Sequence, residues 1–124
     1  MGDIVFDAGA LIALESKSRT IVALLDRAQI DTTIHIPAAV LAQVWRDGRR
    51  QTRLATLLRD KRIHVVEFDQ SVALAAGVLC GTSGTADVVD ASVIVAARRF
   101  KAPVVTSDQS DLSALDPGVL LFSI

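Results

Sequence analysis

Cysteine, tyrosine and tryptophan are scarce in this chain of 124 residues, which has one cysteine, no tyrosine and one tryptophan. With Cys80 alone, no internal disulfide can form, and its apolar neighbours indicate a small core residue rather than a reactive thiol. Aromatic residues make up 4% and hydrophobic residues 51% of the chain, so aliphatic side chains must build the core. So apolar a composition predicts leftover apolar surface and hence a homodimer.

Long apolar runs are lacking as well. No run reaches the roughly 18 residues that a membrane helix needs. Glu15 ends the first apolar segment, and Arg98 ends the most apolar helix expected later in the chain. The chain begins with no basic signal-peptide region. We therefore expect no membrane partner and a cytoplasmic location.

Net charge is also small, at −1, and by itself points to no nucleic-acid partner. The distribution of charge is more informative, because basic residues crowd one stretch in which Asp47 and Asp60 are the only acids. These basic residues are Arg46, Arg49, Arg50, Arg53, Arg59, Lys61 and Arg62.

Apolar, β-branched segments alternate with segments of helical periodicity along the chain. We expect strands over 3–7, 32–36, 63–68, 103–106 and 119–122, and helices over 11–14, 19–29, 38–45, 49–60, 71–80, 86–99 and, as a short turn or helix, 108–115. This alternation predicts an α/β domain spanning 1–124, with a mainly parallel sheet covered by helices on both faces. Such folds place their sites beyond the carboxyl ends of the strands, where the strand order reverses.

Three aspartates stand beside very apolar segments. Asp7 and Asp108 follow expected strands, and Asp90 lies in the second turn of an expected helix, on the same face as Asp87. A carboxylate beside the core costs solvation free energy unless a partner offsets it, so the group suggests a shared cation. Capping or helix-dipole roles stay open as alternatives, for Asp87 above all.

The segment around Asp108 offers further oxygen atoms. Asp111 follows one helical turn later and is either a ligand-shell acid or an ordinary first-turn acid. Thr106 and Ser107 carry hydroxyls that can serve a carboxylate, a substrate phosphate or a turn. An all-oxygen set suits Mg²⁺ or Mn²⁺, whereas zinc would call for histidine or cysteine, and both histidines lie among aliphatic residues.

Three segments together resemble a PIN-domain ribonuclease of the VapC toxin type, over essentially the whole chain. They are Ile-Val-Phe-Asp7-Ala-Gly-Ala-Leu-Ile, Ala-Asp87-Val-Val-Asp90-Ala-Ser-Val-Ile-Val and Val-Val-Thr106-Ser107-Asp108-Gln-Ser-Asp111-Leu. The resemblance implies a three-layer α/β/α sandwich, with Asp7, Asp90 and Asp108 as the catalytic acids. It also implies Mg²⁺- or Mn²⁺-dependent cleavage of RNA, homodimerisation and neutralisation by a small VapB-type antitoxin.

One position departs from the family pattern. A glutamate is usual on the helix after the second strand, and here Gln43 stands in the corresponding segment. The amide keeps an oxygen but lacks the charge, which weakens cation binding unless Asp87 supplies it. The alternative is therefore a catalytically weakened PIN-fold protein that binds RNA or a protein partner.

The basic residues after Gln43 have helical spacing in the sequence. Arg46, Arg49, Arg50 and Arg53 predict a stripe that holds RNA phosphates beside the acids, and the alternative is an ordinary solvated helix face. Trp45, the single tryptophan, fits a core, dimer or antitoxin contact better than stacking on a base.

Two other α/β classes fit less well. A phosphoacceptor receiver domain expects an acid pair after the first strand and a lysine after a late one, whereas Ala8 follows Asp7 here and Ser107 follows Thr106. A haloacid-type phosphatase expects a second acid where Gly9 stands.

Overall fold

Parallel strands form the centre of the protein. The computed structural model describes residues 2–124, and in this part five strands form one sheet in the order β3-β2-β1-β4-β5. All neighbouring strands are parallel. The strands are β1 (Asp3–Phe6), β2 (Thr33–Pro37), β3 (Ile63–Val66), β4 (Val104–Thr106) and β5 (Leu121–Ser123). The parallel sheet expected from the alternation is confirmed.

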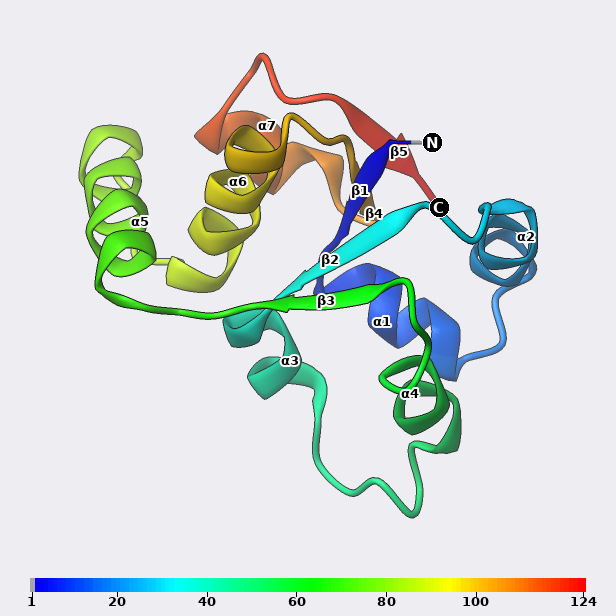
Figure 1. Cartoon of the computed structure of the whole chain (residues 1–124). Helices are drawn as coiled ribbons and strands as arrows, with labels where there is room; N and C mark the ends of the chain where they lie inside the picture. Colours follow the sequence, from blue (N-terminus) through cyan, green and yellow to red (C-terminus); the bar gives the residue numbers. More distant parts are fainter. Residues whose placement is uncertain (1) are drawn as a thin grey trace.

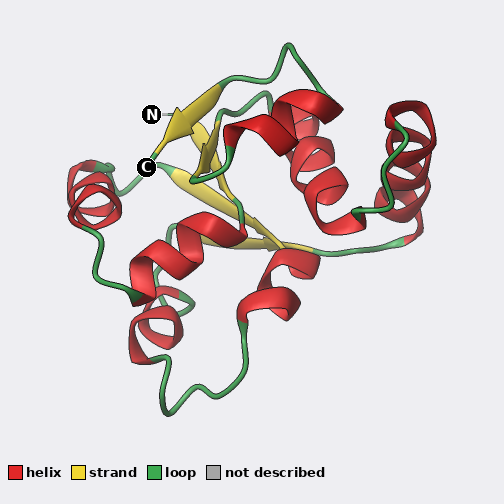
Figure 2. Ribbon diagram, turned by 180° about the vertical axis from the view of Figure 1, so that it is seen from behind, coloured by secondary structure: helices red, strands yellow, loops and turns green. Residues whose placement is uncertain are grey.

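Helices cover both faces of the sheet. On one side lie α1 (Ala8–Glu15), α2 (Arg19–Arg27), α3 (Ala38–Val44) and α4 (Thr52–Leu57), and on the other α5 (Gln70–Ser83), α6 (Val88–Phe100) and α7 (Gln109–Leu115) (Figures 1 and 2). The architecture is therefore the expected three-layer α/β/α sandwich.

The order of the strands reverses at β1. Strands β2 and β3 extend from one side of β1, and β4 and β5 from the other (Figure 1). The register pairs Phe6 with Val105, so β1 and β4 end side by side. This reversal brings the residues after two strands, Asp7 and Asp108, to the same edge although they are far apart in sequence.

The core is aliphatic, as the composition predicts. Helix α6 contributes Ala91, Val93 and Ile94, each fully buried, and packs against the sheet, α3 and α5. Phe6 is the one aromatic residue of the buried core within 2–124, and Cys80 is buried there as expected. Within the same residues no single helix is long and apolar enough to cross a membrane, and α5 and α6 pass such a test only together, across a 112° bend.

Helix α5 is longer than its sequence indicates. The sequence predicts that it ends at residue 80, which is wrong, because the helix continues to Ser83 and ends where Gly84 adopts a φ of 73°. Gly84 donates its N–H to the carbonyl of Cys80, so this glycine, not Gly81, provides the left-handed cap. Asp87 rather than Thr85 caps the next helix, and the Thr85 hydroxyl accepts the N–H of Asp87 at 3.2 Å.

Helix α4 is shorter than expected, because the segment before it forms a loop. The Gln51 side chain accepts the N–H groups of Arg46 and Asp47 at 2.7 and 3.1 Å and donates to the carbonyl of Val44 at 2.8 Å. These bonds replace helical ones, so the helix begins at Thr52 instead of 49. The predicted helical stripe is therefore wrong, because of its four residues Arg46, Arg49, Arg50 and Arg53 only Arg53 lies on a helix.

The same loop folds around Trp45. A Cβ atom on Gly48 would lie 2.8 Å from two carbon atoms of the indole ring, so the ring packs directly on this glycine. Trp45 remains 36% exposed, which makes it a surface anchor of the loop rather than a core residue.

Other element ends differ by a few residues. Helix α1 starts at Ala8, directly after Asp7, because this aspartate caps it. Helix α2 ends at Arg27, and Ser18 stands at its N-cap position without a side-chain hydrogen bond. Strand β3 stops at Val66, and β5 starts only at Leu121. None of these differences moves the expected site.

Candidate functional site

Asp7 links the end of β1 to the start of α1. Its Oδ1 accepts the N–H of Ala10 at 2.9 Å, which makes Asp7 the cap of α1, and the hydroxyl of Thr106 also donates to it. The side chain is 6% exposed. Burial raises the pKa of Asp7, hydrogen bonds from Thr106 and from the N–H groups of Ala10 and Gly9 oppose the shift, and the Asp108 charge adds to it.

Asp87 and Asp90 open helix α6. Asp87 caps the helix, with its Oδ1 accepting the N–H of Asp90 at 3.0 Å. Burial first, then the charge of Asp87 and a hydrogen bond to its side chain, raises the pKa of Asp90 to about 7. The charges of Asp111 and Asp7 add to this shift, so Asp90 readily holds a proton at neutral pH.

Asp108 and Asp111 form a second pair at the start of α7. The hydroxyl of Ser110 donates to Asp108 Oδ1 at 2.9 Å, and this bond together with one shared with Asp111 lowers the pKa of Asp108. The same shared bond and the Asp108 charge raise the pKa of Asp111. The hydrogen bond that they share thus favours the charged form of Asp108 and the neutral form of Asp111. Thr106 accepts the N–H of Asp108 at 2.9 Å.

These carboxyls form one electrostatic cluster. Asp90 is affected by Asp7, Asp87 and Asp111, and Asp7 in turn by Asp108. None of the influences that shift their pKa values comes from a basic side chain. The ion pairs found within residues 2–124 involve other acids, namely Asp3, Asp47, Asp60 and Asp116. The aspartates expected to share a site are thus close enough to repel one another, without a basic partner.

The donor set suits a hard cation in its chemistry, since every donor is a carboxyl, hydroxyl or amide oxygen. Over residues 2–124, no three His, Cys, Asp or Glu side chains already converge on one point as ready ligands. Two of the carboxylates, Asp7 and Asp87, are engaged in capping helices. The side chains of Asp108 and Asp111 share a hydrogen bond with each other. A bound ion would have to draw these side chains closer together.

Gln43 lies on α3, next to the last residue of the helix. Its side chain is exposed and makes no hydrogen bond to a described residue. Helix α3 packs against α6, which carries Asp90. The role of Gln43 near a cation stays a prediction.

The four arginines differ in their surroundings. Arg46 donates to the carbonyls of Ala42 and Trp45 at 3.1 and 2.7 Å, and Arg49 lies 3.4 Å from Asp47 Oδ1. Arg50 and Arg53 are exposed, and Arg53 lines a groove on the helical surface. The side chains of Arg46 and Arg49 therefore stabilise the loop. Contact with RNA stays a prediction for all four arginines.

Sequence reasoning missed two partners of the site. Ser110 holds Asp108, and Gly9 lies against Ser107 so closely that a Cβ atom at position 9 would overlap the Ser107 hydroxyl. A serine two residues after Asp108 could have been recognised in the sequence as a donor of a local hydrogen bond to its side chain. The contact of Gly9 carried no such signal, because it depends on β4 lying beside β1.

A second polar cluster lies near the other end of the sheet. His35 Nδ1 and His64 Nδ1 are 2.8 Å apart, and His35 Nε2 lies 3.1 Å from Asp3 Oδ2, outside hydrogen-bond geometry. The His35 ring stacks on Phe100 with centroids 3.7 Å apart. Burial, the main cause, and the charges of His64 and Arg99 lower the pKa of His35 against the opposing effect of Asp3.

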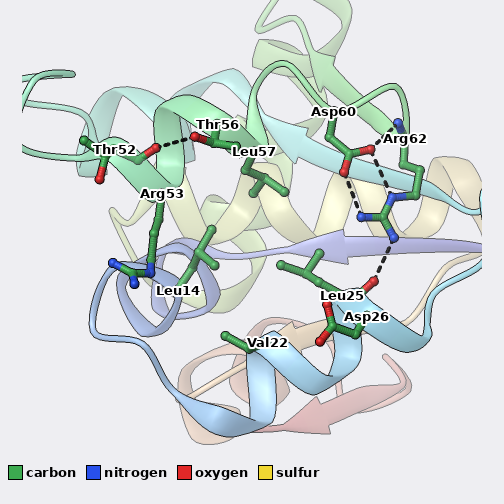
Figure 3. A pocket seen from close by; sticks show the side chains of 10 residues that line it. All are labelled: Leu14, Val22, Leu25, Asp26, Thr52, Arg53, Thr56, Leu57, Asp60 and Arg62. Atoms are coloured by element: carbon green, nitrogen blue, oxygen red, sulfur yellow. Dashed lines mark hydrogen bonds and ion pairs between the residues drawn. The ribbon is translucent and has the colours of Figure 1, made fainter.

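A groove of about 430 Å³ lies between α1, α2 and α4 (Figure 3). Its apolar floor is formed by Leu14, Val22, Leu25 and Leu57, and polar side chains, among them Asp26 and Arg53, surround it. Arg62 closes one end, donating to Asp60 Oδ2 at 2.7 Å and to the carbonyl of Leu25 at 2.8 Å (Figure 3).

Comparisons with known proteins agree with this architecture. The sequence model of the PIN domain family matches residues 4–116. A comparison with curated proteins gave no match. The fold is similar to that of a chain in the VapBC2 complex of Rickettsia felis bound to a promoter DNA fragment, with a TM-score of 0.75, 17% identity and 98% of each chain covered.

Two further solved structures are similar. A toxin–antitoxin complex from Klebsiella pneumoniae has a TM-score of 0.73 and 20% identity, covering 98% of this chain and 99% of that one. VapC20 of Mycobacterium tuberculosis, a toxin that cleaves the sarcin–ricin loop, has a TM-score of 0.68 and 16% identity, covering 94% of this chain and 96% of its own. At such identities the likeness concerns the fold.

Proposed function

The chain belongs to the PIN domain family, and we propose that it is a divalent-metal-dependent endoribonuclease, the toxin of a toxin–antitoxin pair acting in the cytoplasm. The observation that carries the proposal is the aspartate cluster at the carboxyl end of the sheet, which lacks a basic partner within residues 2–124. Structures with the same fold include toxin–antitoxin complexes and a toxin that cleaves RNA, which supports this class of activity.

Asp7, Asp90 and Asp108 would hold Mg²⁺ or Mn²⁺, with Asp87 as a further carboxylate. When bound, such an ion activates water and stabilises the leaving oxygen of a phosphodiester. To bind the ion, Asp90 would have to release the proton that burial and the neighbouring carboxyls favour, whereas the pKa of Asp108 is lowered and favours its charged form. The Thr106 hydroxyl and the first N–H groups of α1 hold the Asp7 carboxylate in place.

Three further side chains support the ligands. Asp111 shares a hydrogen bond with Asp108, while Ser107 and Gln43 offer oxygen atoms from outside the carboxylate set. Because Gln43 is neutral, Asp87 has to supply the charge that a glutamate would bring. The competing function is a PIN-fold protein that binds RNA or a partner without turnover, and it follows if the cluster holds no ion.

RNA would approach along the loop between α3 and α4. Arg50 and Arg53 are the exposed cations of this region, and Arg46 and Arg49 are held on the same loop. We expect these four guanidinium groups to contact phosphates, the sequence-independent part of RNA binding.

The proposed antitoxin would dock in the groove between α1, α2 and α4. Its apolar floor and charged surroundings fit an amphipathic segment of a partner protein. A second copy of the chain would use the apolar face of α5, where Leu74 and Val78 are 63% and 72% exposed at helical spacing.

Metal binding and RNA cleavage test the proposal together. Asp90→Asn should abolish both Mn²⁺ binding in calorimetry and Mn²⁺-stimulated cleavage of RNA, while Asp26→Asn, outside the cluster, changes neither. Absence of Mn²⁺ binding by the wild-type protein up to millimolar concentration would favour the non-enzymatic alternative. Full cleavage by Asp90→Asn would exclude the proposed site.

A further inference from the structure

Gly9 lies where the two halves of the acidic site meet. A Cβ atom at this position would overlap the Ser107 hydroxyl and lie 3.2 Å from both the Cβ and the backbone nitrogen of Ser107. Ser107, on the link from β4 to α7, therefore lies directly against the backbone of the first turn of α1. The φ angle of Gly9 is not positive, so the glycine is needed because space is lacking and not because of its backbone conformation.

Both residues flank aspartates of the site. Asp7 precedes Gly9 by two positions and accepts its N–H, and Asp108 directly follows Ser107. The Asp108 charge raises the pKa of Asp7, so the two carboxyls repel each other across this contact. A side chain on residue 9 would displace the Ser107 hydroxyl and require its Cβ and backbone nitrogen to move by a few tenths of an ångström, at the point where a shared ion needs the two turns close.

The tight fit is not a general property of the helical glycines. Gly77 and Gly81, both on α5, have nothing within 4 Å of an added Cβ atom. Gly77 therefore gives a matched control, because alanine there raises helix propensity in the same way but meets no neighbour.

We propose that Gly9 is a positioning residue of the site: by letting Ser107 lie directly on the first turn of α1, it sets the separation of the Asp7 and Asp108 carboxylates and so the affinity for Mn²⁺. This inference rests on the proposed metal site. Gly9 touches neither ion nor substrate, and it acts through the two aspartates.

Calorimetric titration with Mn²⁺ and thermal unfolding in EDTA test this role. Gly9→Ala should weaken Mn²⁺ binding about 10-fold or more, as expected when the support of a ligand shifts. Gly77→Ala should bind as the wild type does. Adding Ser107→Gly to Gly9→Ala removes the two side-chain atoms nearest the new Cβ, leaving only the backbone nitrogen at 3.2 Å, and should restore most of the affinity, relative to Ser107→Gly alone. The transition in EDTA shows whether each variant folds.

The outcomes separate this inference from the proposed function. Wild-type affinity in Gly9→Ala, with binding lost in Asp7→Asn, overturns the positioning role and keeps the metal site. Wild-type affinity in both variants overturns the metal site itself. A loss in Gly9→Ala that Ser107→Gly does not relieve overturns the proposed contact. If Gly9→Ala does not fold, the double variant decides. A folded double variant that binds Mn²⁺ far more weakly than Ser107→Gly also overturns the proposed contact.

Discussion

The carboxylate of Glu15 accepts the backbone N–H of Leu54 at 2.7 Å, so the last residue of α1 caps a helix far along the chain. Leu54 is the third residue of α4, and its N–H is one of the donors that a helix start leaves without a partner. Gln51 is the N-cap residue of α4, and its side chain does not make this bond. The short helix α4 therefore depends on α1 for its start.

Glu15→Ala should lower the free energy of unfolding by about 1–2 kcal/mol, the usual cost of losing a helix cap. Urea unfolding measures the change. Glu67→Ala is the control, because Glu67 is an exposed acid outside any helix. Equal stability of the two variants would show that α4 begins without help from α1.

Arg62 joins the end of α2 to the turn before β3. Its guanidinium pairs with both oxygens of Asp60 and donates to the carbonyls of Leu25 and Ala28 at 2.8 and 3.1 Å. Lysine cannot reproduce this planar set of donors. Arg62→Lys should therefore lower the unfolding free energy by about 1–3 kcal/mol, the cost of leaving buried acceptors without donors.

Urea unfolding again gives the measurement for Arg62, and Arg59→Lys at an exposed position controls for the change of residue type. A loss in Arg59→Lys as large as that in Arg62→Lys would contradict the role of the four bonds. The experiment also tests the charge pattern of the sequence, since Arg62 belongs to the basic stretch but is committed to the fold.

The acidic cluster should make the metal-free protein less stable as pH rises. The pKa of Asp90 is about 7 in the folded chain against 3.8 for the ordinary side chain, so the folded state binds more protons than the unfolded state between these values. By linkage, the stability that protonated Asp90 contributes is present below about pH 4 and is lost as pH rises towards 7.

Asp90→Asn removes this titration. In EDTA, we expect the unfolding free energy of Asp90→Asn minus that of the wild type to grow between pH 4 and pH 7, measured by urea unfolding at each pH. Asp26→Asn provides the comparison outside the cluster. A difference that stays constant with pH would mean that Asp90 is not crowded by its neighbours.

The exposed arginines of the α3–α4 loop should contribute salt-dependent binding. Arg50→Ala should weaken RNA binding about equally for all sequences and reduce the slope of log affinity against log salt by about 0.7 per lost phosphate contact. Fluorescence anisotropy with a labelled RNA gives both quantities. Arg99→Ala, on the far end of α6, is the control, and an unchanged slope in Arg50→Ala would remove this loop from the RNA path.

Much of the architecture could be predicted from the sequence, because strands and helices leave periodic apolar patterns. The meeting of Asp7 and Asp108 followed from one rule, that sites of parallel sheets lie at the carboxyl ends of strands where their order reverses. The late start of α4, at Thr52 instead of 49, could not be read, since the Gln51 side chain competes with helical bonds only once the loop has folded.

The finer arrangement of the site depended on contacts between distant segments. Asp87 reads equally well as a cap and as a ligand, and the structure shows the cap while the ligand role stays a prediction. The hydrogen bond between Asp108 and Asp111 depends on the directions of both side chains. Gly9 and Ser107 meet only because β4 is inserted beside β1.

The position of β4 beside β1 also sets when the acidic cluster comes into existence. During synthesis Asp7 emerges before Asp87 and Asp90, and β4 with the two aspartates after it emerges about a hundred residues after Asp7. A chain interrupted before residue 104 holds Asp7, Asp87 and Asp90 but lacks Asp108 and Asp111, and the edge of β1 that β4 covers is left open. The cluster is thus completed only after β4 has been made, and a copy that stops before β4 carries no complete site.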